Sequence, residues 1–162
     1  MVSPTGQTRF PLAWLCQRQT STSTSTAESE VVSLSKVTSS LLLPLESTWD
    51  QLVSRSIKVY GREDNMACIS IVKSGWSTSL RFIAKHQRVS IASLAEQWSA
   101  EHRNLTHIGS LQQRADGLTK LMNGQQILRV HAQLGVGPRG LPLAEEFFDF
   151  CKNDRVQIEN QD

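Results

Sequence analysis

A long helix is predicted from the apolar positions that follow residue 30. They recur every three, four or seven residues, as on one face of a helix, at Val31, Leu34, Leu41, Leu45, Trp49 and Leu52. Ser25 and Glu28 have the spacing of a capping box, which predicts that this helix begins directly after Ser25. Pro44 has no N–H to donate, so it should kink or divide the helix.

Three other segments have the pattern of β-strands. Residues 56–61 and 105–111 alternate apolar and polar side chains, as half-buried strands do. Residues 9–19 contain a short apolar run with Pro11 near its beginning, where a strand tolerates proline.

Helical spacing returns in the rest of the chain. It predicts helices over residues 65–73, closed by Gly75, and then over 80–98, 113–121 and 125–134. Strands mixed with helices in this order predict an α/β fold, or an α+β fold with a mixed sheet if the early strands are antiparallel.

The length of 162 residues, 39% of them hydrophobic, suits one modest domain. The longest apolar runs are far shorter than a membrane span, and the first residues do not form a secretory leader. We therefore expect an intracellular chain, in the cytoplasm or the nucleus. Its three cysteines are far apart and have no zinc-like spacing, which favours reduced and mostly buried thiols.

The net charge of +2 is unevenly distributed. Residues 145–162 carry six acids against two bases, which gives −4. The remaining 144 residues carry 15 bases and nine acids, which gives +6. A basic body with an acidic tail is typical of a domain that binds a polyanion.

Three acids fall at places where carboxylates from distant segments can converge. Glu30 lies in the first turns of the predicted long helix, Asp64 follows the predicted strand, and Asp116 begins a later helix. Converging carboxylates repel one another, and bound Mg²⁺ relieves the repulsion because it prefers oxygen ligands. Periodicity alone does not select these three from 15 acids, and a solvated surface carboxylate is the alternative for each.

Four segments resemble, in order, the blocks of a known family. They are Pro11-Leu-Ala-Trp-Leu-Cys-Gln-Arg-Gln-Thr20, Ser25-Thr-Ala-Glu-Ser-Glu-Val-Val-Ser-Leu-Ser35, Glu63-Asp-Asn-Met-Ala-Cys-Ile69 and Gln113-Arg-Ala-Asp-Gly-Leu-Thr-Lys120. They are similar to W-x-S-K-R-Q, S-(S/T)-x-E-A-E-(Y/V)-x-A-L-S, (E/x)-D-N-x-(A/S)-x-I and Q-x-A-D-x-x-T-K. These are blocks of the ribonuclease H domain that ends the Pol polyprotein of copia-type retrotransposons. The resemblance covers residues 9–136.

This resemblance implies a ribonuclease H-like fold and a metal-dependent nuclease. Glu30, Asp64 and Asp116 match the family's catalytic, metal-binding acids. In the complete domain such acids hold two Mg²⁺ ions, which activate water and stabilise the leaving oxygen as the RNA strand of an RNA/DNA hybrid is cleaved. The implied partners are the hybrid and the reverse transcriptase part of a longer polyprotein.

The chain departs from the family in one respect. The family has a further Asp on its first strand, in a block resembling D-A-D-W-A, whereas no acid precedes Glu28 here. We therefore expect a truncated domain that lacks the first strand and much of the second, and that is inactive or nearly so alone. Residues 1–8 would be a lead-in, 9–136 the incomplete domain and 137–162 an acidic tail. The alternative is a non-catalytic remnant that binds nucleic acid or a protein.

Arg81, Lys85 and Arg88 are spaced at i, i+4 and i+7, which places them on one side of the helix predicted over residues 80–98. From there they could contact the phosphates of a hybrid, whose A-like form is recognised through its shape and backbone. A solvated helix face is the alternative. Among the tryptophans, Trp14 and Trp98 are expected in the core and Trp76 at the surface.

Overall fold

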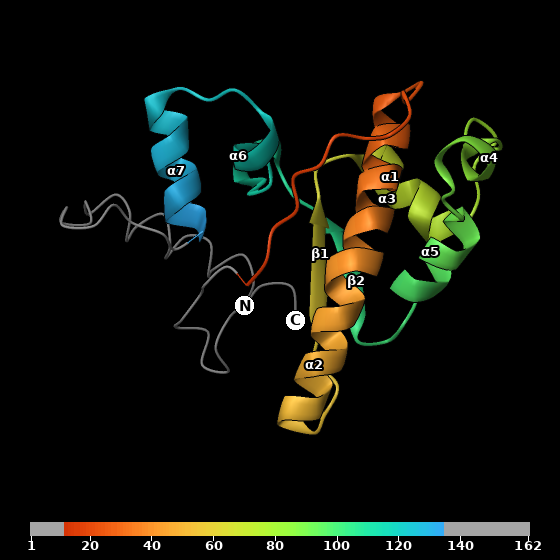
Figure 1. The fold of residues 1–162 in the computed structure, drawn as a ribbon, viewed down its shortest axis with the longest axis horizontal. Helices are drawn as coiled ribbons and strands as arrows, with labels where there is room; N and C mark the ends of the chain where they lie inside the picture. The colour runs from red at the N-terminus through yellow and green to blue at the C-terminus, as the bar shows by residue number, and fades with distance from the viewer. Residues whose placement is uncertain (1–11, 135–162) are drawn as a thin grey trace. The chain divides into compact units, whose positions relative to one another are not determined.

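The computed structural model describes residues 12–134, which divide into two compact units (Figure 1). The larger unit is Leu15–Gln113, and the described part of the smaller one is residues 12–14 and 114–134. The larger unit combines helices with a two-stranded parallel sheet, so the predicted mixture of helix and strand in an α/β arrangement is confirmed. Both domain boundaries expected from the sequence, after residues 8 and 136, lie outside the described residues.

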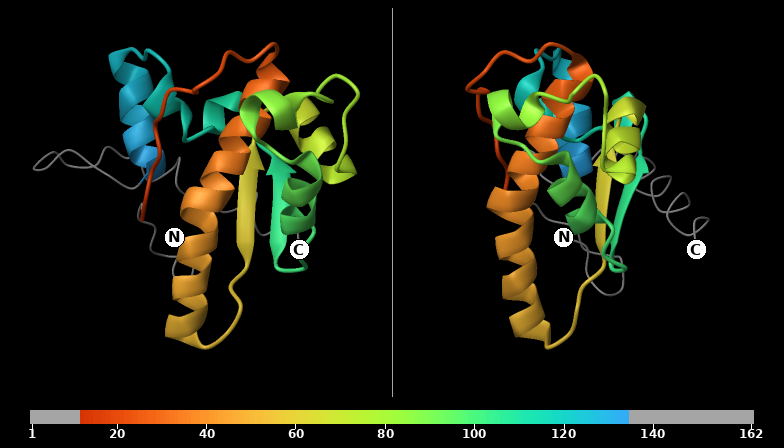
Figure 2. Two further views of the ribbon diagram at one scale, coloured as in Figure 1. Left: turned by 45° about the vertical axis from the view of Figure 1, so that its right-hand side comes forward. Right: turned by 90° about the vertical axis from the view of Figure 1, so that its right-hand side faces the viewer.

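The long helix runs through Pro44 instead of being divided by it. Helix α1 (Thr26–Val37) continues through the π-helical turn η1 (Thr38–Leu42) into α2 (Leu43–Val53) (Figures 1 and 2). In the wide turn the Leu43 N–H donates to the Thr38 carbonyl, five residues back. Pro44 lies at the start of α2, where its missing N–H breaks no regular helical bond. The π-turn is therefore what lets the helix continue where the sequence predicts a kink or a break.

The start of α1 is capped as predicted, with one difference. The Glu28 N–H donates to the Ser25 hydroxyl at 3.1 Å, which is the first half of a capping box. The Glu28 carboxylate does not return to Ser25 but accepts from the backbone N–H of Thr24 at 2.7 Å and from its hydroxyl at 2.5 Å. These hydrogen bonds from Thr24 lower the pKa of Glu28.

The sheet consists of β1 (Val59–Glu63) and β2 (Arg103–His107), which pair in parallel with Gly61 opposite Leu105. Helix α3 (Met66–Ser74) follows β1 and contacts both strands as well as α1 and α5 (Ile91–Trp98). The core is built from apolar side chains of α1, α3, α5 and β2 and of the segment that joins α3 to α5: Val31, Cys68, Ile69, Val72, Leu80, Ile83, Val89, Ile91, Leu94 and Leu105.

Trp98, at the end of α5 (Ile91–Trp98), joins three elements of the larger unit. A Cβ on Gly61 would lie 2.4 Å from the Trp98 ring, so only glycine leaves room for the indole against β1. The indole N–H donates to the Thr38 hydroxyl at 3.2 Å. Thr38 is fully buried, and its hydroxyl also donates to the Leu34 carbonyl at 2.7 Å. The wide turn is thereby tied to the core.

Two predictions about secondary structure are wrong. Residues 80–98 form not one helix but two, α4 (Ile83–Gln87) and α5, because Arg88 adopts a left-handed conformation with φ 56°. Ser90 then caps α5 by accepting from the Ser93 N–H at 3.2 Å. The strand predicted over residues 9–19 is also absent from its described part, 12–19, which forms neither strand nor helix.

In the smaller unit, α6 (Asp116–Thr119) is shorter than predicted, whereas α7 (Gly124–Leu134) agrees with its prediction. A Cβ on Gly117 would lie 2.4 Å from Val130 Cγ1, so this glycine allows the two helices to pack closely. No helix within residues 12–134 is both long enough and apolar enough to cross a membrane.

Candidate functional site

Glu30 and Asp64 act on one buried carboxyl group. Glu30 lies on α1, and Asp64 directly follows Glu63, the last residue of β1. The negative charges of Glu30 and Asp64 both raise the pKa of Glu63, so the three acids share one electrostatic environment. The structure therefore brings two of the three predicted site residues to the carboxyl end of β1.

Glu63 was not anticipated as part of this site. It is 7% exposed, and burial, together with the negative charges of Glu30 and Asp64, raises its pKa to about 7. A hydrogen bond from the Asn65 N–H to Glu63 Oε1, at 3.0 Å, opposes this effect only in part. The alternation of side chains along the strand could have predicted that Glu63 is buried. It places Glu63 on the same side of β1 as Gly61, and this side contacts Trp98.

Asn65 determines how the chain leaves β1. Its side-chain oxygen accepts from the N–H groups of Ala67 at 3.0 Å and Cys68 at 3.2 Å, which caps α3. The turn from strand to helix is therefore completed within two residues. Asp64 is held in this turn, next to the end of the strand.

Cys68, in the first turns of α3, is fully buried beside the acids. Burial, together with the charges of Glu63 and Glu30, raises the pKa of this thiol to about 12. A thiol with so high a pKa stays protonated and is a poor nucleophile. The prediction of a buried thiol outside any disulfide is confirmed for Cys68. Cys16 is exposed, and Cys151 lies outside the described residues.

Asp116 belongs to the smaller unit. It begins α6, and its Oδ2 accepts from Lys120 Nζ at 2.7 Å, one turn further along. This i,i+4 ion pair satisfies the carboxylate locally.

No group of three or more His, Cys, Asp or Glu side chains in the described part of the chain is placed to hold a metal ion. Mg²⁺ prefers near-octahedral oxygen coordination, and a two-ion centre needs several converging carboxylates. The acids of the larger unit do not, by themselves, fit that requirement.

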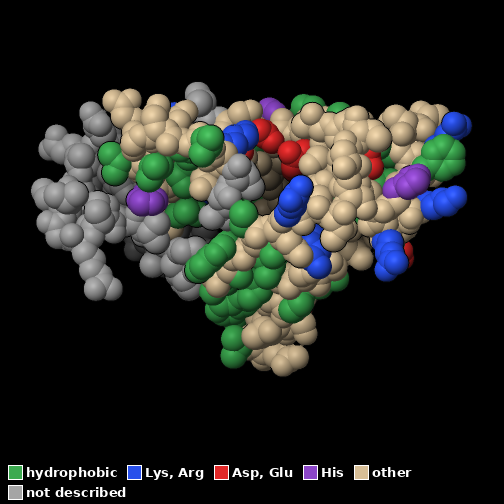
Figure 3. Space-filling view, turned by 45° about the horizontal axis from the view of Figure 1, so that its top comes forward, with side chains coloured by type: hydrophobic (Ala, Val, Ile, Leu, Met, Phe, Trp, Pro, Cys, Tyr) green, Lys and Arg blue, Asp and Glu red, His purple; other side chains and the backbone are tan. Residues whose placement is uncertain are grey.

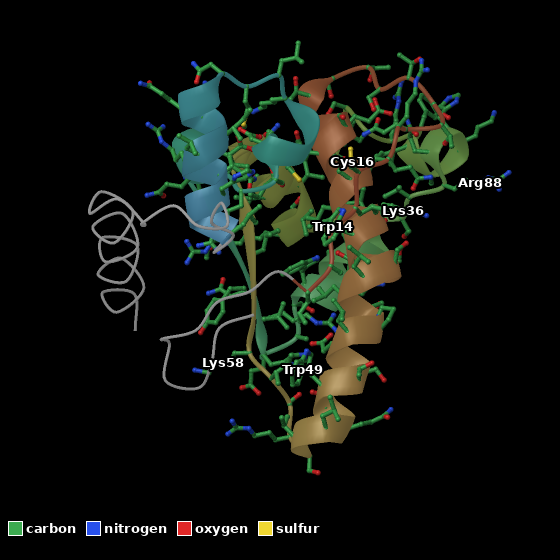
Figure 4. All side chains as sticks on the ribbon, turned by 60° about the vertical axis from the view of Figure 1, so that its left-hand side comes forward. Trp14, Cys16, Lys36, Trp49, Lys58 and Arg88 are labelled. Atoms are coloured by element: carbon green, nitrogen blue, oxygen red, sulfur yellow. The ribbon has the colours of Figure 1, made fainter. Side chains whose placement is uncertain are left out.

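The predicted basic residues surround a short helix instead of sharing one helical face. Arg81 precedes α4, Lys85 lies on it and Arg88 ends it, and all three are exposed. The Arg81 guanidinium lies 4.8 Å from the centre of the Phe82 ring, which is itself 57% exposed. Figure 3 shows basic and histidine side chains gathered at the side of the larger unit that carries α4, and Arg88 points outward in Figure 4.

The tryptophans divide between core and surface. Trp76 is 65% exposed, as predicted, and Trp98 packs against the core. Trp14 is 69% exposed, so the expectation that it lies in the core is wrong. The reason is that the segment before α1 forms no strand that could carry it inward.

A second charged cluster lies where the strands begin. Glu46 on α2 is 5% exposed, and its Oε1 accepts from His102 Nε2 at 2.7 Å and from Arg103 Nε at 3.2 Å. Arg103 Nη2 donates to Oε2 at 2.5 Å. Burial alone would raise the pKa of Glu46, but the hydrogen bonds and charges of Arg103 and His102 outweigh it and lower that pKa. No local sequence pattern links residues this far apart.

Comparison of this chain with protein-family models, with curated proteins and with solved structures found no match. The resemblance to copia-type ribonuclease H domains therefore depends on the motif residues themselves, and function has to be argued from them and from the site.

Proposed function

We propose that this chain derives from the ribonuclease H domain of a copia-type retrotransposon Pol polyprotein and that it binds RNA/DNA hybrids without cleaving them by itself. The ribonuclease H-like arrangement of its strands and helices is part of this proposal. The observation that carries it is the convergence of Glu30 and Asp64 on Glu63, because these two acids stand in the motifs that suggested the family.

The absence of cleavage follows from the state of the acids. Two-metal hydrolysis needs carboxylates arranged around two ions, and no such arrangement is present in residues 12–134. Glu63 adds a third carboxyl group at the end of β1, and burial together with the charges of Glu30 and Asp64 raises its pKa to about 7.

Hybrid binding is supported by the exposed cations at α4. Arg81, Lys85 and Arg88 are exposed, and exposed aromatic rings at Trp76 and Phe82 lie in the same stretch of chain. Cations neutralise phosphates and release counterions, and aromatic faces stack on bases that become exposed.

Fluorescence anisotropy with a labelled RNA/DNA hybrid tests the binding. Replacing Arg81, Lys85 and Arg88 together by Gln should weaken binding about tenfold or more, and should reduce the slope of log K against log salt by up to about 3. The matched control replaces Arg55, Lys58 and Arg62 by Gln. These residues are also exposed, and their replacement removes the same number of positive charges. Equal affinity and equal salt slope in the two triple variants would contradict the proposed surface.

A cleavage assay tests the other half of the proposal. The chain incubated with the same hybrid and Mg²⁺ should leave the RNA strand intact, and Asp64→Asn should keep the hybrid affinity. Robust cleavage that disappears in Asp64→Asn would show that the chain is a working nuclease and would overturn the non-catalytic part of the proposal.

A further inference from the structure

The loop before α1 packs against the end of α4. Threonine and serine alternate through it from residue 20 and reach the first residue of α1, Thr26. The Ser21 hydroxyl donates to the His86 carbonyl at 3.3 Å, and Gln87 Nε2 donates to the Thr22 carbonyl at 3.5 Å. Both segments lie within the larger unit. These contacts hold a row of hydroxyl groups beside the exposed cations of α4.

Most hydroxyl groups of this run are already engaged. Four of the seven form hydrogen bonds within the larger unit: those of Ser21, Ser23, Thr24 and Ser25. In the described part of the chain the other three have no hydrogen-bond partner: those of Thr20, Thr22 and Thr26. Among these three, Thr22 is the one whose backbone accepts a hydrogen bond from α4, and it is exposed. The structure thereby distinguishes Thr22 from its neighbours.

Basic side chains lie next to the contact between Thr22 and α4. Gln87 is flanked in the chain by His86 and Arg88, which are both exposed. Arg88 ends α4 in a left-handed conformation and points outward in Figure 4. Glu28, which Gln87 also contacts, is buried. A negative group added to Thr22 would therefore meet positive charge at the surface.

From the exposed hydroxyl of Thr22 and the cations beside it, we propose that Thr22 is a phosphorylation site whose phosphate is bound by Arg88. A Ser/Thr protein kinase transfers the γ-phosphoryl group of ATP to Thr22 Oγ1. The bond from phosphorus to Oγ1 forms, the bond from phosphorus to the bridging oxygen of ADP breaks, and the hydroxyl proton passes to solvent. The product carries a charge of about −1.5 to −2 at pH 7 and three acceptor oxygens, which suit the paired N–H groups of a guanidinium.

Phosphorylation of Thr22 weakens binding of the RNA/DNA hybrid, an effect that rests on the proposed function. The phosphate occupies Arg88 and repels the phosphates of the hybrid from α4. One cation fewer is then available to neutralise the hybrid and release its counterions. We expect the hybrid affinity to fall about tenfold or more, and the slope of log K against log salt to decrease by about 1.

A ³¹P NMR titration of the full chain with phosphothreonine incorporated at position 22 tests the contact with Arg88. The guanidinium should hold the second pKa of the phosphate below its usual value of about 6, and Arg88→Gln should return it to about 6. Phosphothreonine at position 20 is the matched control, because Thr20 is also exposed but has no hydrogen bond to α4 in the described part of the chain. Equal pKa values at the two positions, or a pKa at position 22 that Arg88→Gln leaves unchanged, would overturn the binding of the phosphate by Arg88.

Fluorescence anisotropy with the labelled hybrid tests the consequence for binding. The chain phosphorylated at position 22 should bind about tenfold more weakly than the unmodified chain, and the chain phosphorylated at position 20 should lose less. Equal losses at the two positions, or undiminished affinity at position 22, would overturn the regulatory role. If the unmodified chain does not bind the hybrid, the proposed function fails, whereas the ³¹P titration still decides whether Arg88 binds the phosphate.

Incubation of the unmodified full chain with ATP and a eukaryotic cell lysate tests the choice of residue. Tandem mass spectrometry should find phosphate on Thr22 ahead of the other six hydroxyl residues of the run. Thr22→Val should remove most of the phosphate incorporated into this run, whereas Thr20→Val should not. Phosphate found only on other residues of the run, or on none of them, would overturn the assignment of Thr22.

Discussion

Two buried glutamates at opposite ends of the same pair of strands respond to burial in opposite ways. Glu46 is 5% exposed and Glu63 is 7% exposed, so solvent access does not distinguish them. Even so, the pKa of Glu46 is lowered whereas that of Glu63 is raised to about 7. The degree of burial therefore does not decide the sign of the shift.

The difference lies in the neighbours of each carboxylate. Glu46 is bound by the guanidinium of Arg103 and by the His102 ring, which stabilise its charged form. Glu63 receives one backbone N–H, from Asn65, and faces the negative charges of Glu30 and Asp64. One end of the sheet is thus arranged for stability. At the other end, a buried carboxyl group lies near two negative charges, and such an unfavourable arrangement is more typical of functional sites than of structural ones.

Breaking the ion pairs of Glu46 should have the largest effect on the free energy of unfolding. Glu46→Ala would leave Arg103, whose side chain is 10% exposed, without its anion. Removing one partner of a buried ion pair leaves an uncompensated charge, so we expect the free energy of unfolding to fall by about 3 to 4 kcal/mol. Urea denaturation followed by circular dichroism at pH 7 measures this change.

The matched control is Glu96→Ala, which removes an exposed acid from α5 and should alter the free energy of unfolding by less than about 0.5 kcal/mol. A loss in Glu46→Ala no larger than in this control would mean that the cluster of Glu46, His102 and Arg103 does not hold α2 to β2.

Removing the charge of Glu63 should instead increase the free energy of unfolding, by an amount that depends on pH. The pKa of Glu63 is 4.5 in the unfolded chain and about 7 in the folded chain. The folded state therefore favours the protonated carboxyl group, whose contribution to stability is complete below pH 4.5 and is lost as the pH rises through 7. Glu63→Gln does not titrate. At pH 8 we therefore expect this variant to be more stable than the parent by roughly 2 to 3 kcal/mol.

Denaturation at pH 5, 6, 7 and 8 checks this prediction. The gain in Glu63→Gln should grow with pH across that window, and Glu96→Gln should keep the pH dependence of the parent. A gain independent of pH would show that Glu63 does not titrate between pH 4.5 and 7 in the folded chain.

Local signals in the sequence predicted the elements that carry their own start and stop residues. Helix α3 begins at the cap Asn65 and ends at Gly75, where φ is 71°, and both are visible as residue types. The helix predicted over residues 80–98 is interrupted where Arg88 has φ 56° and where Val89, between α4 and α5, is buried. Tertiary burial of one apolar side chain outweighed helical periodicity there.

The sites were harder to predict because their parts are distant in sequence. Arg103 and Glu46 are 57 positions apart, and nothing in either segment indicates the other. Glu30 and Asp64 were selected only by resemblance to a family, while Glu63 was overlooked although it is next to Asp64. The alternation along a strand predicts which residues face inward, but it does not predict which charged side chains they will meet. Glu30 comes close to Glu63 only when α1 packs against the rest of the larger unit.

The smallest effect on stability is expected from a change at the contacts of Glu28, a third buried glutamate. Its carboxylate is stabilised by hydroxyl and amide donors in place of cations. It is 6% exposed, and its pKa is lowered mainly by the hydroxyl and the N–H of Thr24. Thr24→Val removes the hydroxyl but keeps the shape, so we expect a loss of about 1 kcal/mol at pH 7 and a rise in the pKa of Glu28. Thr24→Ser keeps the hydroxyl and should retain most of both. Carbon-detected NMR titration of the Glu28 carboxyl in each variant measures the pKa. If the pKa stays equally low in Thr24→Val, the backbone N–H of Thr24 and the amide of Gln87 suffice, and the hydroxyl contributes only to the capping of α1.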